Sequence, residues 1–177
     1  MAIFKSRSTL TRWRSKSNAS CEGAQMSDHN QTPAVSDTQP IRKPTIPKDA
    51  AVLVVEDNVS NFVLIARMLG YLGIHCEWKT SGYEVVEYAD TLPRLDLILM
   101  DIRLPYEDGY GALKKIRASE RFKAVPIVAV TAEASLEQMK KAQDSGFDGF
   151  LGKPLDPDRF PDQIRRILNG EPVWEFS

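Results

Sequence analysis

Short apolar segments alternate with amphipathic ones along most of this chain, and that alternation limits the folds open to it. The run Ala51–Val55 is apolar throughout and stops at Glu56, which is typical of a strand buried on both faces. The apolar residues between 62 and 69 then recur at helical spacing. The same reading predicts further strands near 75–79, 95–100, 126–130 and 149–151, and further helices near 83–90, 111–118, 136–145 and 160–168.

Five strands that alternate with five helices predict a doubly wound α/β domain. Parallel strands need helical crossovers, and right-handed crossovers place those helices on both faces of one sheet. The first, third and fourth strands are the most apolar, so we expect them at the centre. We expect 75–79 at an edge, because His75, Glu77 and Lys79 would line a wetter face.

Charge divides the chain of 177 residues into two parts. Residues 1–48 hold eight Lys and Arg against three acidic residues, whereas 49–177 hold fifteen against twenty-one. The first part is also rich in Ser, Thr, Gln and Pro, a composition that cannot bury enough apolar surface to order itself. We therefore predict a disordered basic N-terminal tail over 1–48, one domain over 49–170, and a short C-terminal tail over 171–177.

Cysteine content and hydropathy indicate the compartment. The two cysteines offer neither a disulfide framework nor a paired spacing for zinc. No apolar run is long enough to span a bilayer, and basic residues interrupt the place where a signal peptide would be apolar. These features predict a cytoplasmic protein without a transmembrane segment.

Acidic side chains that could bind a metal or take part in catalysis follow the predicted strands. Glu56 and Asp57 come after the first strand and Asp101 after the third, and parallel strands end at one edge of a sheet. Any one of these acids could merely cap the next helix. Three carboxylates together repel one another and call for a cation, and an all-oxygen set suits Mg²⁺.

Two further polar residues stand at the carboxyl ends of the fourth and fifth predicted strands, at the same edge of the sheet. Thr131 and Lys153 would add a hydroxyl and an ammonium beside the acids. Such groups stabilise a phosphoryl group while it is transferred, and a carboxylate can act as its acceptor by forming an aspartyl-phosphate.

Four motifs in this order resemble the receiver domains of two-component response regulators: residues 54–58, 97–105, 128–132 and 150–154. The resemblance covers about 51–169. It implies the flavodoxin-like strand order 2-1-3-4-5. It also implies that Asp101 accepts a phosphoryl group from a phosphohistidine on a sensor histidine kinase or a histidine phosphotransfer protein.

The family pattern assigns roles residue by residue. Asp57, Asp101 and the backbone carbonyl of Arg103 would hold Mg²⁺, with Glu56 acting through a bound water. Lys153 would pair with Asp101 and then with the phosphoryl oxygens, and the Lys153–Pro154 bond would be cis.

The switch and a lifetime control are implied in the same way. Thr131 would turn its hydroxyl onto the phosphate, Phe150 would rotate inward, and the small Ala132 would permit that rotation. Arg103 would face Glu133 across the site entrance, and we expect this pair to screen the phosphoryl group from water and to slow dephosphorylation.

The function expected on this basis is that of a stand-alone, single-domain response regulator in a phosphorelay. It would catalyse only its own phosphorylation and dephosphorylation, and would bind a protein effector through residues 135–145 and 149–169 without contacting nucleic acid directly. A pseudo-receiver that is never phosphorylated is one alternative. A Mg²⁺-dependent phosphatase is another, although such enzymes need an acidic residue two positions after the nucleophile, where Arg103 stands.

Overall fold

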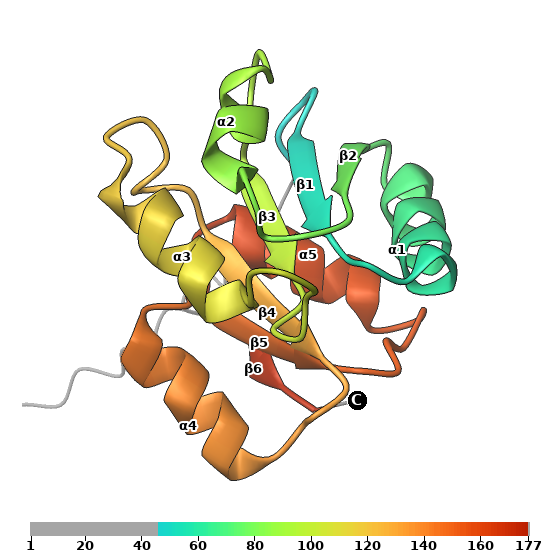
Figure 1. Ribbon diagram of the computed structural model, residues 1–177. Coiled ribbons are helices and arrows are strands. Elements are labelled where there is room, and N and C mark those ends of the chain that lie inside the picture. Colours follow the sequence, from blue (N-terminus) through green and yellow to red (C-terminus); the bar gives the residue numbers. More distant parts are fainter. Residues whose placement is uncertain (1–45, 177) are drawn as a thin grey trace, which may run out of the picture. The chain divides into compact units, whose positions relative to one another are not determined.

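The computed structural model describes residues 46–176, and these form one α/β unit (Figure 1). The elements alternate as predicted along the chain. The strands are β1 Ala51–Val55, β2 His75–Lys79, β3 Leu97–Met100, β4 Ile127–Thr131, β5 Gly149–Gly152 and β6 Trp174–Glu175. The helices are α1 Val59–Tyr71, α2 Val85–Asp90, α3 Gly109–Ala118, α4 Leu136–Ser145 and α5 Phe160–Leu168.

All strand pairs in the sheet are parallel, and the order is β2-β1-β3-β4-β5-β6. The predicted order 2-1-3-4-5 is therefore confirmed, with one strand added beyond β5. Every residue of β3 and β4 is buried, as expected of central strands, whereas β2 lies at an edge and His75 is exposed.

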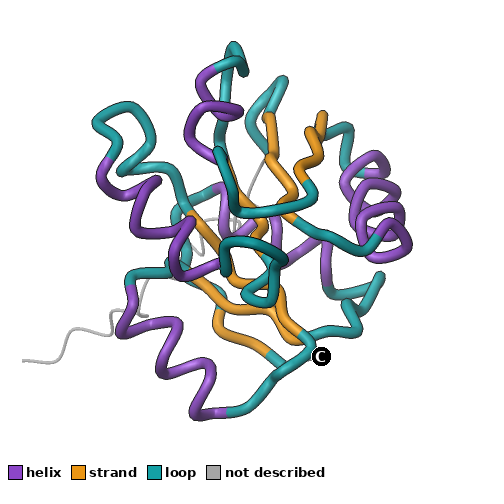
Figure 2. Tube along the Cα trace, viewed as in Figure 1, coloured by secondary structure: helices purple, strands orange, loops and turns teal. Residues whose placement is uncertain are grey.

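Alternate side chains of each strand face two separate helical layers, which Figure 2 shows on either side of the strands. Buried residues of α1 and α5 pack with Val52, Val54 and their neighbours on one face. Buried residues of α2, α3 and α4 pack with Leu53, Val55 and theirs on the other. Both faces are covered, so the central strands β1, β3 and β4 are almost entirely apolar.

Polar side chains fix where three of the helices begin. Asn58, Asp108 and Ser135 each accept a hydrogen bond from the backbone N–H three residues later, in front of α1, α3 and α4. Such caps satisfy donors that a helix leaves unpaired at its first turn. The cap at Asn58 also fixes the chain directly after Glu56 and Asp57.

The segment after α5 differs from the tail that the sequence predicts over 171–177. Trp174 and Glu175 form β6, which pairs with Phe150 and Leu151 of β5. The Phe150 N–H donates to the carbonyl of Val173 at 2.7 Å, and Val173 is fully buried. A strand of two residues is too short to show a periodicity, and its partner strand determines it.

Residues 1–45 of the predicted basic tail lie outside the described residues. Within 46–176, no helix is both long and apolar enough to cross a bilayer.

Glu175 ties β6 to α5 and allows a test by pH. Its carboxylate accepts hydrogen bonds from Arg159 at 2.8 Å, Gln163 at 2.9 Å and Arg166 at 2.7 Å. The hydrogen bond from Gln163 and the partner Arg166 lower the pKa of Glu175. A lowered pKa means that the ionised carboxylate stabilises the fold at neutral pH and loses that effect as the pH falls through the folded-state value.

We expect Glu175→Gln to lower the free energy of unfolding by about 1 kcal/mol at pH 7, because a charge-assisted acceptor is lost. The difference from wild type should shrink below about pH 4, where the carboxyl group is increasingly protonated. Urea unfolding of both proteins, at pH 7 and again below about pH 4, measures this difference in the free energy of unfolding. Glu171→Gln is the control, since Glu171 lies 3.5 Å from Arg166 and is largely exposed. A difference that did not change with pH would contradict this account.

Candidate functional site

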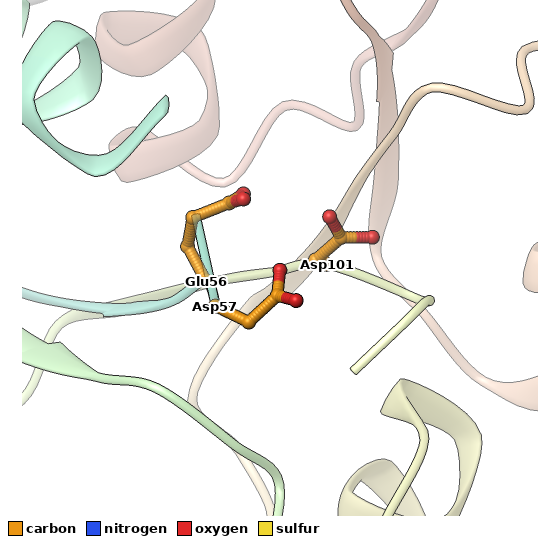
Figure 3. A group of neighbouring side chains, drawn as sticks. All are labelled: Glu56, Asp57 and Asp101. Carbon is orange, nitrogen blue, oxygen red and sulfur yellow. The ribbon is translucent and has the colours of Figure 1, made fainter. Parts of the chain in front are cut away.

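Three carboxylates meet where β1 and β3 end, as Figure 3 shows. Glu56 and Asp57 follow the last residue of β1, and Asp101 follows the last residue of β3. Because β1 and β3 are neighbours in register, with Val55 beside Met100, the three residues come side by side. One carboxylate oxygen from each lies within 4.8 Å of the others. The sequence prediction that these acids share one edge is confirmed by this geometry.

The three acids differ in their surroundings. Glu56 is buried, and its Oε1 accepts from the Asn61 side chain at 2.9 Å and from the Asn58 N–H at 3.3 Å. Asp101 is 7% exposed, and Asp57 is exposed. Glu56 is thus held by the start of α1, while Asp57 faces the solvent and can meet an incoming ion.

Lys153 directly follows β5, which β4 separates from β3, and its side chain reaches the same acidic cluster. Its Nζ lies 2.5 Å from Asp101 Oδ2 and 2.6 Å from Glu56 Oε2, and its side chain is 11% exposed. Burial alone would lower the pKa of Lys153, but the hydrogen bonds and charges of Asp101 and Glu56 outweigh it and raise that pKa. The ammonium is therefore charged at neutral pH. The Lys153–Pro154 peptide bond is cis, as predicted.

The donor set fits a divalent cation. Three carboxylates and one ammonium leave two negative charges uncompensated within one small cluster. Hard oxygen ligands of this kind suit Mg²⁺, which needs few protein groups and retains several waters. The Arg103 N–H donates to Asp101 Oδ1 at 2.8 Å, so the loop after β3 folds back onto the acid. A metal contact by the Arg103 carbonyl stays a prediction.

Thr131 ends β4 at the same edge and is buried. Its hydroxyl accepts from the Glu133 N–H at 3.2 Å, and its carbonyl accepts from the Lys153 N–H at 2.8 Å. Ala132, which follows it, is exposed. Phe150 is fully buried in β5, three residues before Lys153. The switch roles predicted for Thr131, Ala132 and Phe150 stay predictions, since these contacts describe one state.

The Arg103–Glu133 ion pair expected from the sequence is present. Arg103 Nη2 lies 2.5 Å from Glu133 Oε2, and the two side chains are 71% and 45% exposed. The hydrogen bond and the charge of Glu133 raise the pKa of Arg103. Residues 103 and 133 thus join the loop after β3 to the loop after β4.

Two residues that support the site carry no clear signal in the sequence. Asn61 holds Glu56 from the first turn of α1, where the Asn58 cap places it five residues after the acid. Gly109 leaves room for the backbone of Asp101, because a Cβ at Gly109 would lie 2.6 Å from the Asp101 carbonyl oxygen. An Asp-Gly pair is a turn signal in general.

Comparison with protein families matches residues 52–165 to the response regulator receiver domain. The signal transduction histidine-protein kinase BarA of Escherichia coli (strain K12) is 35% identical over 122 residues, which are 69% of this chain and 13% of that kinase. The probable methanogenesis regulatory protein FilR2 of Methanothrix harundinacea (strain 6Ac) is 33% identical over 132 residues, 70% of this chain and 82% of that protein. The chain thus spans a small part of the kinase and most of FilR2.

Solved structures agree with the fold. The receiver domain of a sensor histidine kinase from Pseudomonas aeruginosa PAO1, with a magnesium ion coordinated in its active site cleft, is 35% identical with a TM-score of 0.62. The match covers 70% of this chain and all of that one, 100%. The chemotaxis response regulator CheY4 of Vibrio cholerae is 28% identical with a TM-score of 0.63, covering 68% and 99%.

Asp57 offers the most direct test of the metal site, because it is the exposed member of the cluster. We expect Asp57→Asn to weaken Mg²⁺ binding by about tenfold or more, since a charged ligand becomes neutral. Calorimetric titration with MgCl₂ measures the affinity. Asp144→Asn is the matched control, because Asp144 is an exposed acid on α4 paired with Lys140. Equal affinities for wild type and Asp57→Asn would contradict the assignment.

Proposed function

The chain belongs to the response regulator receiver domain family, and from this membership we propose that Asp101 accepts a phosphoryl group and thereby switches protein binding. The observation that carries the proposal is the position of Asp101, which lies within 4.8 Å of two other acids and 2.5 Å from the Lys153 ammonium. An isolated aspartate at a strand end would have neither the two acidic neighbours nor the ammonium. The domain as a whole is a receiver of two-component signalling.

The chemistry follows from the groups around Asp101. A carboxylate oxygen of Asp101 would form the new bond to phosphorus, and the bond from phosphorus to a histidine nitrogen of the donor would break, with its electron pair leaving on that nitrogen. Asp57, Asp101 and the Arg103 carbonyl would hold Mg²⁺, with Glu56 acting through a water, and the ion would supply positive charge to the phosphoryl group. Lys153 orients Asp101 beforehand and then neutralises the phosphoryl charge.

The donor that fits this site is a phosphohistidine on a sensor histidine kinase or a histidine phosphotransfer protein. Several relatives are themselves histidine kinases, which supports a donor of that class. We propose that the chain acts in the cytoplasm as a single-domain regulator. FilR2 supports a regulator in which the receiver makes up most of the protein, since the match spans 82% of it.

The output surface that we propose comprises α4, β5 and α5, which bind a protein effector and no nucleic acid. Among the described residues of α4, only Ala142 is buried, so little apolar contact holds that helix in place. Phosphorylation would draw the Thr131 hydroxyl onto the phosphate, and Phe150 would turn into the space beside it, next to Ala132. A weakly held α4 can respond to such a change.

Intact-mass measurement tests the proposal. After incubation with MgCl₂ and acetyl phosphate, the wild-type chain should gain one phosphoryl group, and Asp101→Asn should gain none. Omitting Mg²⁺ should abolish the adduct on the wild type. An adduct on both proteins would place the acceptor elsewhere. An adduct on neither would favour a pseudo-receiver that binds constitutively.

Arg103 offers a test of phosphoryl lifetime. We expect Arg103→Ala to dephosphorylate several-fold faster, because the pair with Glu133 would no longer screen the phosphoryl group from water. The backbone N–H that holds Asp101 is retained in this variant. Decay of the intact-mass adduct after removal of the donor measures the rate.

Arg121→Ala is the control for this test, since Arg121 forms a similarly exposed ion pair with Asp90 in the α2 region. Unchanged decay in Arg103→Ala would show that the Arg103–Glu133 pair has no kinetic role.

A further inference from the structure

The edge of β5 is covered by a strand from the same chain. β6 lies beside β5 with Trp174 opposite Phe150 and Glu175 opposite Leu151 (Figure 1). Successive side chains of β6 alternate between the two faces of the sheet. Val173 packs with the core of α1 and α5, while Trp174 and Phe176 pack with the core of α2, α3 and α4. The pattern of this strand is thus a carboxylate with an aromatic residue on each side.

The side of α5 next to β6 is built to receive that carboxylate. Arg159, Gln163 and Arg166 all donate to Glu175, and Arg159 also donates to the Phe176 carbonyl at 3.2 Å. Two positive charges and an amide converge on one acidic side chain. An extended segment that lacks an acid at this position would leave the two arginines and the glutamine without this carboxylate acceptor.

Gly149 at the start of β5 accommodates the close approach of this backbone. A Cβ at Gly149 would lie 2.7 Å from the Val173 carbonyl oxygen, a distance that real Cβ atoms essentially never show. A glycine inside a strand often marks a place where another backbone comes close. The β5 edge is therefore shaped for a neighbouring strand.

Phe150 connects this edge to the acidic site. Its ring meets the ring of Phe176 edge-on, with centroids 6.0 Å apart, and its N–H donates to Val173. Lys153, three residues after Phe150 and directly after β5, bonds Asp101 and Glu56. A change in the position of Phe150 would therefore alter both the ring contact and the backbone contact that hold β6.

We propose that the β5 edge is a docking surface for an extended strand, covered here by β6, and that phosphorylation of Asp101 opens it to a partner segment of the same chemistry. That segment carries an acidic side chain between two aromatic ones. Partners commonly add a strand to an exposed sheet edge, with backbone hydrogen bonds giving affinity and side-chain pockets giving specificity. The opening step rests on the proposed function of Asp101, whereas the docking surface itself does not.

A labelled synthetic peptide with the sequence of residues 171–177 is the probe, and fluorescence anisotropy with the full-length chain is the measurement. The peptide should bind about fivefold or more tightly after MgCl₂ and acetyl phosphate have phosphorylated the chain. Asp101→Asn with the same donor should show no gain. A peptide carrying the Glu175→Lys change should bind neither form, because it places a positive charge against Arg159 and Arg166.

The variant Phe176→Ala tests the docking surface without phosphorylation. It weakens the chain's own strand, so the unphosphorylated variant should bind the wild-type peptide more tightly than the unphosphorylated wild type does. Circular dichroism checks that the variant is folded, and Tyr71→Ala, which removes an exposed aromatic from α1, is the control.

The outcomes separate the two proposals. A phosphoryl adduct without any gain in peptide binding would overturn the coupling and leave the function of Asp101 intact. No adduct would refute the function, while Phe176→Ala would still decide the docking surface. Failure of folded Phe176→Ala to bind the peptide would overturn that surface.

Discussion

The site depends on one largely buried ammonium, that of Lys153. The carboxyl ends of β1 and β3 bring Glu56, Asp57 and Asp101 together, and like charges at such distances repel strongly where water is scarce. Lys153 reaches this cluster from β5, far away along the chain, and bonds two of the three acids. It offsets part of the repulsion and leaves a charge that a divalent cation can balance. Removing that ammonium would leave buried Glu56 without its charged partner, which is the costly case for a buried charge.

The strand that precedes this lysine, β5, has two roles. At its carboxyl end the strand contributes to the acidic site, and in its middle Phe150 packs under the segment that covers the sheet edge. Phe150 and Lys153 are three residues apart, and every residue of β5 is buried. Packed interiors shift between discrete arrangements more readily than they deform gradually. Under the proposed function, a strand in this position would carry the charge change at Asp101 to the surface between α4 and α5.

Much of the fold could be predicted because local signals agree with the global arrangement. The predicted bounds of β1, β2 and α4 match the structure. The apolar run of β1 ends at Glu56, and Ser135 caps α4. The helix predicted from residue 83 instead begins at Val85, because Glu84 adopts a left-handed conformation that no sequence signal marks. The acids of the site follow from strand ends, whereas the strand β6 depends on pairing with the distant β5.

The added strand changes which parts of the proposed output face a partner can reach. α4 keeps an exposed surface around Leu136, whereas Arg159, just before α5, and Arg166 of α5 already bind Glu175. A partner that uses Arg159 or Arg166 must therefore compete with Glu175. A partner that binds only α4 does not compete with Glu175. Effectors of these two kinds would respond differently to a change in β6, so the proposed phosphorylation of Asp101 would affect them to different extents.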